Sequence, residues 1–314
     1  MKLQTQVQLE KAQNAITYEG HILSLGSCFA EHIGNKLGYY KFRSVSNPFG
    51  ILFHPLAIEN LLTRAIAEKG YTKADVFFLN ERWHCFDGHS ILSHASVETL
   101  LDRLNTGLQQ TRQQIKEASH ILITLGTSWV YRSKVSGAVV ANCHKVPQKQ
   151  FIKELLSLDE VVSCLERITK LIQSNNPHVQ LVFTVSPIRH LKDGCVENQR
   201  SKAHLITAIH RMLEKGSISY FPSYEIMMDE LRDYRFYAED MVHPSDLAIT
   251  YIWEKFKECW VDNKAYPIME KVGEIQRGLS HRPFDPNSGQ HLVFLKSLEQ
   301  KMESLKQTYP FMGF

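Results

Sequence analysis

Apolar and polar positions follow two periodicities along the chain, and their alternation predicts an α/β protein. Short apolar runs that end at Gly, Pro or Asn turns predict strands at residues 21–25, 40–45, 120–125, 179–185 and 217–221. Apolar residues three or four positions apart predict helices at residues 28–37, 56–69, 158–174, 197–215 and 245–259. Strands that alternate with helices in this way predict a doubly wound parallel sheet of about five strands.

Two segments depart from this regular alternation. Residues 76–94 alternate like an antiparallel hairpin, and residues 97–118 form a long helical pattern with few apolar positions, so residues 70–118 are expected to be a hairpin-helix insertion. Beyond Asp262 the patterning weakens until an amphipathic helix at about 290–307. We therefore expect one α/β domain over residues 15–262 and a C-terminal helical appendage over 263–314 that packs on the same domain.

Composition and charge exclude several classes of protein. Of the 314 residues, 43% are hydrophobic and 22% are charged, which excludes a disordered chain. The 36 Lys and Arg residues against 33 Asp and Glu residues give a net charge of +3 without a basic block, which argues against a partner that is a nucleic acid or a membrane surface. No apolar run is long enough for a membrane helix, and residues 1–10 lack the apolar stretch of a signal peptide, so a cytoplasmic location is expected.

The six cysteines are dispersed along the chain. Neighbouring cysteines are at least 21 residues apart and none forms a Cys-x-x-Cys pair, so we expect reduced thiols and no structural zinc. The histidines follow no ligand spacing typical of a metal site either. The sequence therefore predicts neither a metal nor an organic cofactor.

Polar residues follow every predicted strand of the sheet. Because ligands bind outside the carboxyl ends of the strands in an open α/β sheet, these residues are the candidates for a functional site. In chain order they are Ser27 and Cys28, Asn47 and Gly50, Ser128, Arg189 and His190, and Asp240 and His243. A nucleophile, a base beside a carboxylate and turn amides would thus meet at one edge, which is the set of groups that acyl transfer requires.

Asp240 and His243 can act as a pair. His243 is a candidate general base, and Asp240, three residues before it, can orient the imidazole. Ser245 is better placed than Asp240 to cap the following helix, which leaves Asp240 available for this role.

The turn after the first strand carries a more specific signal. Residues 26–30 read Gly-Ser-Cys-Phe-Ala, and the chain resembles the GSCFA family of the SGNH (GDSL-like) hydrolase superfamily. The resemblance covers nearly the whole chain and includes residues 47–50, 125–131, 141–145, 186–193 and 240–244. It implies a flavodoxin-like three-layer sandwich and a nucleophile-His-Asp triad in which His243 and Asp240 share one loop. It does not specify the substrate.

Two residues compete for the role of nucleophile. Aligning residues 25–28 without gaps on the Gly-Asp-Ser turn of the superfamily places Cys28 at the nucleophile position, whereas a shift of one residue selects Ser27. A thiol at the amino end of a helix is stabilised as a thiolate by the helix dipole and by a neighbouring imidazolium. If Cys28 is the nucleophile, its pKa is expected to lie below the free value of ~8.5.

The group that stabilises the oxyanion is less evident. Many superfamily members carry Gly-x-Asn-Asp after the third strand, whereas residues 126–129 read Gly-Thr-Ser-Trp here, so the usual Asn is missing. Candidate replacements are the amide of Gly50 and the side chains of Asn47, Ser128 and the more distant Asn142. Arg189 and His190 suit a polar or anionic part of the substrate.

These residues lead to two functional hypotheses. The first is an esterase or acyltransferase that acts on an ester or thioester of a small molecule, glycan or lipid through a covalent acyl-enzyme. The second is a non-catalytic ligand-binding or scaffold protein that retains the fold after losing the oxyanion donor.

Overall fold

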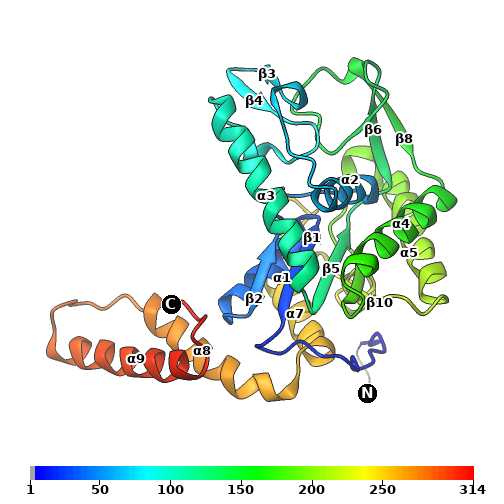
Figure 1. The fold of residues 1–314 in the computed structure, drawn as a ribbon. Coiled ribbons are helices and arrows are strands. Elements are labelled where there is room, and N and C mark those ends of the chain that lie inside the picture. Colours follow the sequence, from blue (N-terminus) through cyan, green and yellow to red (C-terminus); the bar gives the residue numbers. More distant parts are fainter. Residues whose placement is uncertain (1–3) are drawn as a thin grey trace.

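The centre of the molecule is a parallel five-stranded sheet, seen in a computed structural model that describes residues 4–314. Its strands are β1 (His21–Gly26), β2 (Arg43–Ser46), β5 (His120–Leu125), β9 (Gln180–Val185) and β10 (Ser219–Tyr220). They lie in the order β10-β9-β5-β1-β2 (Figure 1), with Leu23 opposite Ile121 and Leu122 opposite Val182. This is the flavodoxin-like order, in which the first strand lies inside the second.

Helices cover both faces of the sheet. One face is covered by α1 (Cys28–Tyr39) and α7 (Asp246–Trp260), and the other by α2 (Pro55–Ile66), α3 (Val97–Glu117), α4 (Leu158–Asn175) and α5 (Cys195–Leu213). Alternate strand residues face opposite layers, so Leu23 joins the core with α2 to α5 while Ile22 joins the core with α1 and α7. The predicted α/β fold with a doubly wound parallel sheet is therefore confirmed.

Side-chain caps set the start of several helices. Ser157 and Glu160 form a capping box at the start of α4, and each satisfies a backbone N–H of the other. Ser245 caps α7 by accepting the N–H of Ala248. This leaves Asp240 available for other contacts, as the sequence indicated.

Two predicted boundaries differ from the structure by three residues. The second strand begins at Arg43 and not at residue 40, because Tyr40 is the C-cap of α1 and Lys41 takes a left-handed φ of 62°. Helix α2 ends at Ile66 and not at residue 69, because Glu68 takes the left-handed conformation, with a φ of 54°, two residues before Gly70.

Two small antiparallel sheets stand beyond the carboxyl ends of the central strands (Figure 1). The predicted hairpin is confirmed but shorter, and consists of β3 (Phe77–Leu79) and β4 (Arg82–His84). The other sheet has the order β7-β6-β8 and contains β6 (Trp129–Ser133), β7 (Val139–Val140) and β8 (Phe151–Leu155). Strand β8 was not predicted. Helix α3, at the end of the expected insertion, buries Leu100 and Leu104 in the main core.

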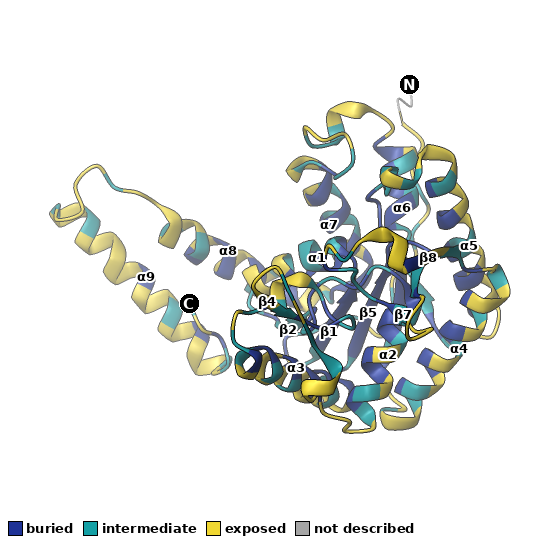
Figure 2. Ribbon diagram, turned by 90° about the horizontal axis from the view of Figure 1, so that it is seen from above, coloured by how far each residue is buried: buried dark blue, intermediate teal, exposed yellow. Residues whose placement is uncertain are grey.

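The C-terminal part consists of two helices that project from the domain (Figures 1 and 2). Helix α8 (Tyr266–Ser280) was not predicted, and it buries Met269 and Val272 against the α1 and α7 side of the core. Helix α9 (Gly289–Thr308) is mostly exposed but packs Leu298 onto Gly278, where a methyl group would lie 2.7 Å from that side chain.

The segment between β10 and α7 carries two of the candidate site residues. It contains α6 (Ser223–Glu225) and a π-helical turn, Ile226–Glu230, which lead into the loop that holds Asp240 and His243.

Within residues 4–314, no helix combines the length and the apolar composition needed to cross a bilayer.

Candidate active site

The site lies where the strand order reverses, between the carboxyl ends of β1 and β5. The N–H of Ser27 donates to the carbonyl of Thr124 at 3.0 Å, and the N–H of Gly126 donates to the carbonyl of Phe53 at 2.8 Å. A methyl group on Gly126 would lie 3.0 Å from that carbonyl oxygen, 3.2 Å from His190 Nε2 and 3.3 Å from Ser27 Cβ. Gly126 therefore allows the turns after three strands to meet.

The two candidate nucleophiles occupy different positions at the start of α1. Ser27 is the N-cap, fully buried, and its Oγ accepts the N–H of Phe29 at 3.4 Å. Cys28 is the first residue of the helix and is partly exposed.

The expected pKa of the thiol is wrong in direction. Burial raises the pKa of Cys28 to about 11, against the opposing effects of backbone N–H groups and of Lys202. Loss of hydration disfavours the thiolate more than the helix dipole favours it. The resting thiol is therefore protonated at neutral pH.

His243 and Asp240 form the pair that the sequence predicted. His243 Nδ1 lies 2.6 Å from Asp240 Oδ2, while Asp240 Oδ1 accepts the backbone N–H groups of Val242 and His243, both at 2.9 Å. These hydrogen bonds hold the pKa of Asp240 at about 2. The carboxylate is therefore ionised, binds Nδ1 of the imidazole and leaves Nε2 as the nitrogen that can exchange a proton.

His243 affects the pKa of one residue of α1 and of one residue in the loop after β9. Burial is the main cause of the lowered pKa values of His32 and His190, and His243 lowers both of them further. His32 lies one helical turn after Cys28 on α1. Among residues 4–314 no hydrogen bond joins His243 to Ser27 or Cys28, so the contact between base and nucleophile stays a prediction.

Arg189 supports the loop of His243. Its backbone N–H donates to the carbonyl of Val242 at 3.3 Å, its guanidinium donates to the carbonyl of Met241, and the guanidinium lies 4.4 Å from the ring centre of Tyr237. The expected substrate contact remains a prediction, and the contacts present here fix the position of the Asp240 and His243 loop.

The candidate oxyanion donors make local contacts. The N–H of Gly50 donates to the carbonyl of Asn47 at 2.7 Å, and Asn47 Oδ1 accepts the N–H of Gly26 at 2.8 Å. Ser128 is fully buried, and its Oγ donates to the carbonyl of Ser201 at 3.1 Å. These contacts support the turns after β1, β2 and β5. Asn47 Nδ2 is buried without a partner among the described residues, and the oxyanion role expected of the three residues stays a prediction.

Asn142 lies elsewhere, in the turn after β7. Its Oδ1 accepts the N–H of His144 at 2.9 Å, and its backbone N–H donates to the carbonyl of Phe86. The structure does not join it to the turn at Gly126 by any hydrogen bond of the described residues.

Lys202 is a site residue that the sequence reasoning missed. It is fully buried on α5, and its Nζ donates to the carbonyls of Gly126 and Ser186, both at 2.7 Å, which ties together the ends of β5 and β9. Burial lowers its pKa to about 7, with an opposing effect from Cys28. No carboxylate of residues 4–314 forms an ion pair with it.

A sequence signal for Lys202 was nevertheless present. The residue lies three positions before Leu205 and seven before Ile209, in the apolar stripe of the helix. A lysine in such a stripe is unusual, because lysines are rarely fully buried without a partner.

Among residues 4–314, no group of three or more His, Cys, Asp or Glu side chains is arranged to hold a metal ion.

Comparisons with known proteins support a family assignment. A search of curated proteins finds no match to the chain. The family model described as "GSCFA domain protein, C-terminal domain" matches residues 272–314, and the model described as "GSCFA family" matches residues 21–256. The second match covers most of the chain, and the chain therefore belongs to the GSCFA family.

Proposed function

We propose that this protein hydrolyses or transfers the acyl group of an ester or thioester through a covalent intermediate on Cys28. The observation that carries the proposal is the pairing of His243 Nδ1 with Asp240 Oδ2 at 2.6 Å, on the sheet edge where α1 begins with Cys28. The flavodoxin-like strand order and the Asp-x-x-His loop also support a place in the SGNH hydrolase superfamily. The substrate class that we propose is an ester of a small molecule, glycan or lipid.

Cys28 is favoured over Ser27 by the local geometry. Ser27 is fully buried, and its hydroxyl is engaged as the N-cap of α1, whereas Cys28 is partly exposed at the first helical position. A residue at the first helical position also offers its backbone N–H to a bound anion, because the first N–H groups of a helix have no partner inside it.

The proposed reaction has two halves. In the first, His243 Nε2 takes the thiol proton as the sulfur of Cys28 attacks the carbonyl carbon, the new bond places the negative charge on the carbonyl oxygen, and collapse expels the leaving group, which receives the proton from His243. In the second half, water or an alcohol gives its proton to His243, attacks the thioester and releases the acyl group. The proton returns to the sulfur.

The high pKa of Cys28 determines how the nucleophile should be tested. Alkylating reagents need a thiolate, so the exposed Cys195 should react before the protonated Cys28. An acyl donor can instead react with the protonated thiol, because in the proposed reaction His243 removes the thiol proton as the sulfur attacks. The protein is therefore incubated with p-nitrophenyl acetate, quenched in acid and analysed by peptide mass spectrometry.

We expect an acetyl group on the peptide that contains Cys28. Cys28→Ala should abolish this label and the release of p-nitrophenol. Ser27→Ala should retain both, although the loss of the N-cap should lower the free energy of unfolding by about 1 kcal/mol. Cys195→Ala, at an exposed cysteine, is the matched control. Loss of the label in Ser27→Ala alone would assign the nucleophile to Ser27. Equal labelling of all these variants would favour the non-catalytic ligand-binding or scaffold protein.

A further inference from the structure

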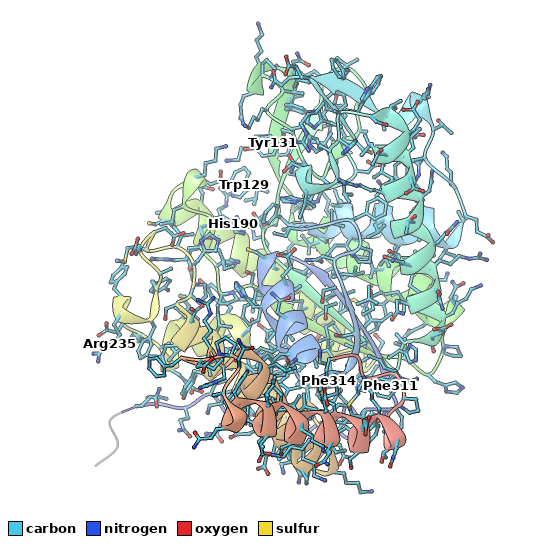
Figure 3. All side chains as sticks on the ribbon, turned by 90° about the vertical axis from the view of Figure 1, so that its left-hand side faces the viewer. Trp129, Tyr131, His190, Arg235, Phe311 and Phe314 are labelled. Atoms are coloured by element: carbon cyan, nitrogen blue, oxygen red, sulfur yellow. The ribbon has the colours of Figure 1, made fainter. Side chains whose placement is uncertain are left out.

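The imidazole of His190 presents a buried nitrogen without a partner beside the turn of the nucleophile. Its Nε2 is buried and has no hydrogen-bond partner among the described residues. The same nitrogen and Ser27 Cβ pack closely on Gly126, because a methyl group built there would lie 3.2 Å from the nitrogen and 3.3 Å from that carbon. Figure 3 shows His190 on the same flank of the molecule as Trp129 and Tyr131.

The position of this ring is fixed from two sides. The ring of Phe53 packs edge-on against it, with ring centres 5.4 Å apart, and the backbone N–H of His190 donates to Asn198 Oδ1 at 2.8 Å. Phe53 also accepts the N–H groups of Gly126 and Thr127 through its carbonyl, so one segment holds both the imidazole and the turn after β5. The nitrogen is therefore held in place before any ligand binds.

The imidazole is neutral under all ordinary conditions. Burial lowers the pKa of His190 to about 3, and Lys202 and His243 act in the same direction. A neutral imidazole carries one N–H, and in the tautomer with the proton on Nε2 this N–H has no acceptor among the described residues. A buried polar atom without a partner costs about 1–3 kcal/mol, and an acceptor brought by a ligand would recover this cost.

We propose that His190 Nε2–H is the side-chain donor of the oxyanion hole, in place of the Asn that is missing after β5. The inference rests on the proposed function. As the sulfur attacks, the electron pair of the carbonyl moves onto its oxygen, and His190 donates a hydrogen bond to this oxygen while keeping its proton. The backbone N–H at the start of α1 is the second donor.

The test compares acyl transfer with alkylation of the same thiol. His190→Ala should lower kcat for p-nitrophenyl acetate on the order of 100-fold, as the loss of one oxyanion donor does, with a much smaller change in KM. His190→Gln, which keeps an N–H donor, should recover part of the loss. Alkylation of Cys28 by iodoacetamide, followed on its peptide at mildly alkaline pH, should proceed at the wild-type rate, because displacement of iodide places no charge on a carbonyl oxygen. The exposed His178→Ala is the matched control.

Three outcomes would overturn the inference. Wild-type kcat in His190→Ala would show that no oxyanion contact exists. Equal loss of turnover in the Ala and Gln variants, together with altered alkylation of Cys28, would show that His190 only supports the fold. A wild-type protein that turns over no faster than Cys28→Ala would refute the proposed function itself, and the inference with it.

Discussion

Replacing the buried Lys202 with methionine should change how stability depends on pH. Burial lowers the pKa of Lys202 from 10.5 to about 7, so between these pH values the unfolded chain binds a proton that the folded protein lacks. The stability of the wild type therefore rises with pH across this window, and the cost of burying the charge is present in full below about pH 7. A tenfold change in proton affinity corresponds to about 1.4 kcal/mol, which makes the full cost about 5 kcal/mol.

Methionine removes this cost and also removes two hydrogen bonds. The carbonyls of Gly126 and Ser186, each 2.7 Å from Nζ, lose their donor. Each loss costs about 1–3 kcal/mol, so near pH 6.5 the two effects should roughly cancel. At about pH 8.5 the cost of the buried charge in the wild type is smaller by about 2 kcal/mol, and Lys202→Met should then be less stable than the wild type by about that additional amount.

Urea unfolding followed by tryptophan fluorescence, at about pH 6.5 and about pH 8.5, measures this difference. Lys170→Met, on the exposed side of α4, is the control and should show the same difference from the wild type at both pH values. Cys28 is present in all three proteins, so its own titration largely cancels. A difference between wild type and Lys202→Met that stays constant within about 0.5 kcal/mol would refute the reasoning, because Lys202 would then ionise like an exposed lysine.

Two further predictions concern the turn after β1 and the loop after β10. Gly26→Ala should destabilise the protein by on the order of 3 kcal/mol in the same unfolding assay, because Gly26 has a φ of +129° and a methyl group would lie 2.0 Å from the carbonyl oxygen of Thr124. Gly38→Ala, where a methyl group meets nothing within 4 Å, should instead stabilise α1 by about 0.5–1 kcal/mol, and a similar loss at both sites would contradict this account. Asp240→Asn should lower kcat for p-nitrophenyl acetate on the order of 100-fold or more with at most a small decrease in the unfolding midpoint, because the exposed carboxylate orients His243 and lies outside the core; unchanged turnover would exclude the proposed pair.

The strands and helices of the central sheet could be predicted because each has a strong local pattern. The runs that became β5 and β9 are fully or almost fully buried, and Ser157 and Ser245 mark helix starts by their own hydrogen bonds. Strand β8 could not be predicted, because its residues 152 and 153 are exposed and it exists only through pairing with β6. Its stability comes from partners distant in sequence, which no local window contains.

The candidate site shows the same division between local and distant causes. The pairing of Asp240 with His243 could be predicted because they lie three positions apart within one loop. The role of Lys202 could not, because its acceptors lie 76 and 16 residues away in the sequence. The pKa of Cys28 was predicted in the wrong direction for a related reason: the helix dipole is a local effect, whereas burial depends on everything that packs around the thiol.

These distant causes give the site a common electrostatic character. Burial shifts Cys28, His190 and Lys202 alike toward their neutral forms, with pKa values of about 11, about 3 and about 7. The ionised carboxylate of Asp240 lies instead at the exposed rim. In the proposed reaction, Cys28 therefore becomes charged only when its proton moves to His243, and the negative charge forms among donors that are already in place. Dipoles fixed by the fold stabilise such a charge without the reorganisation that water would need, which is why a resting thiol that is neutral is compatible with acyl transfer.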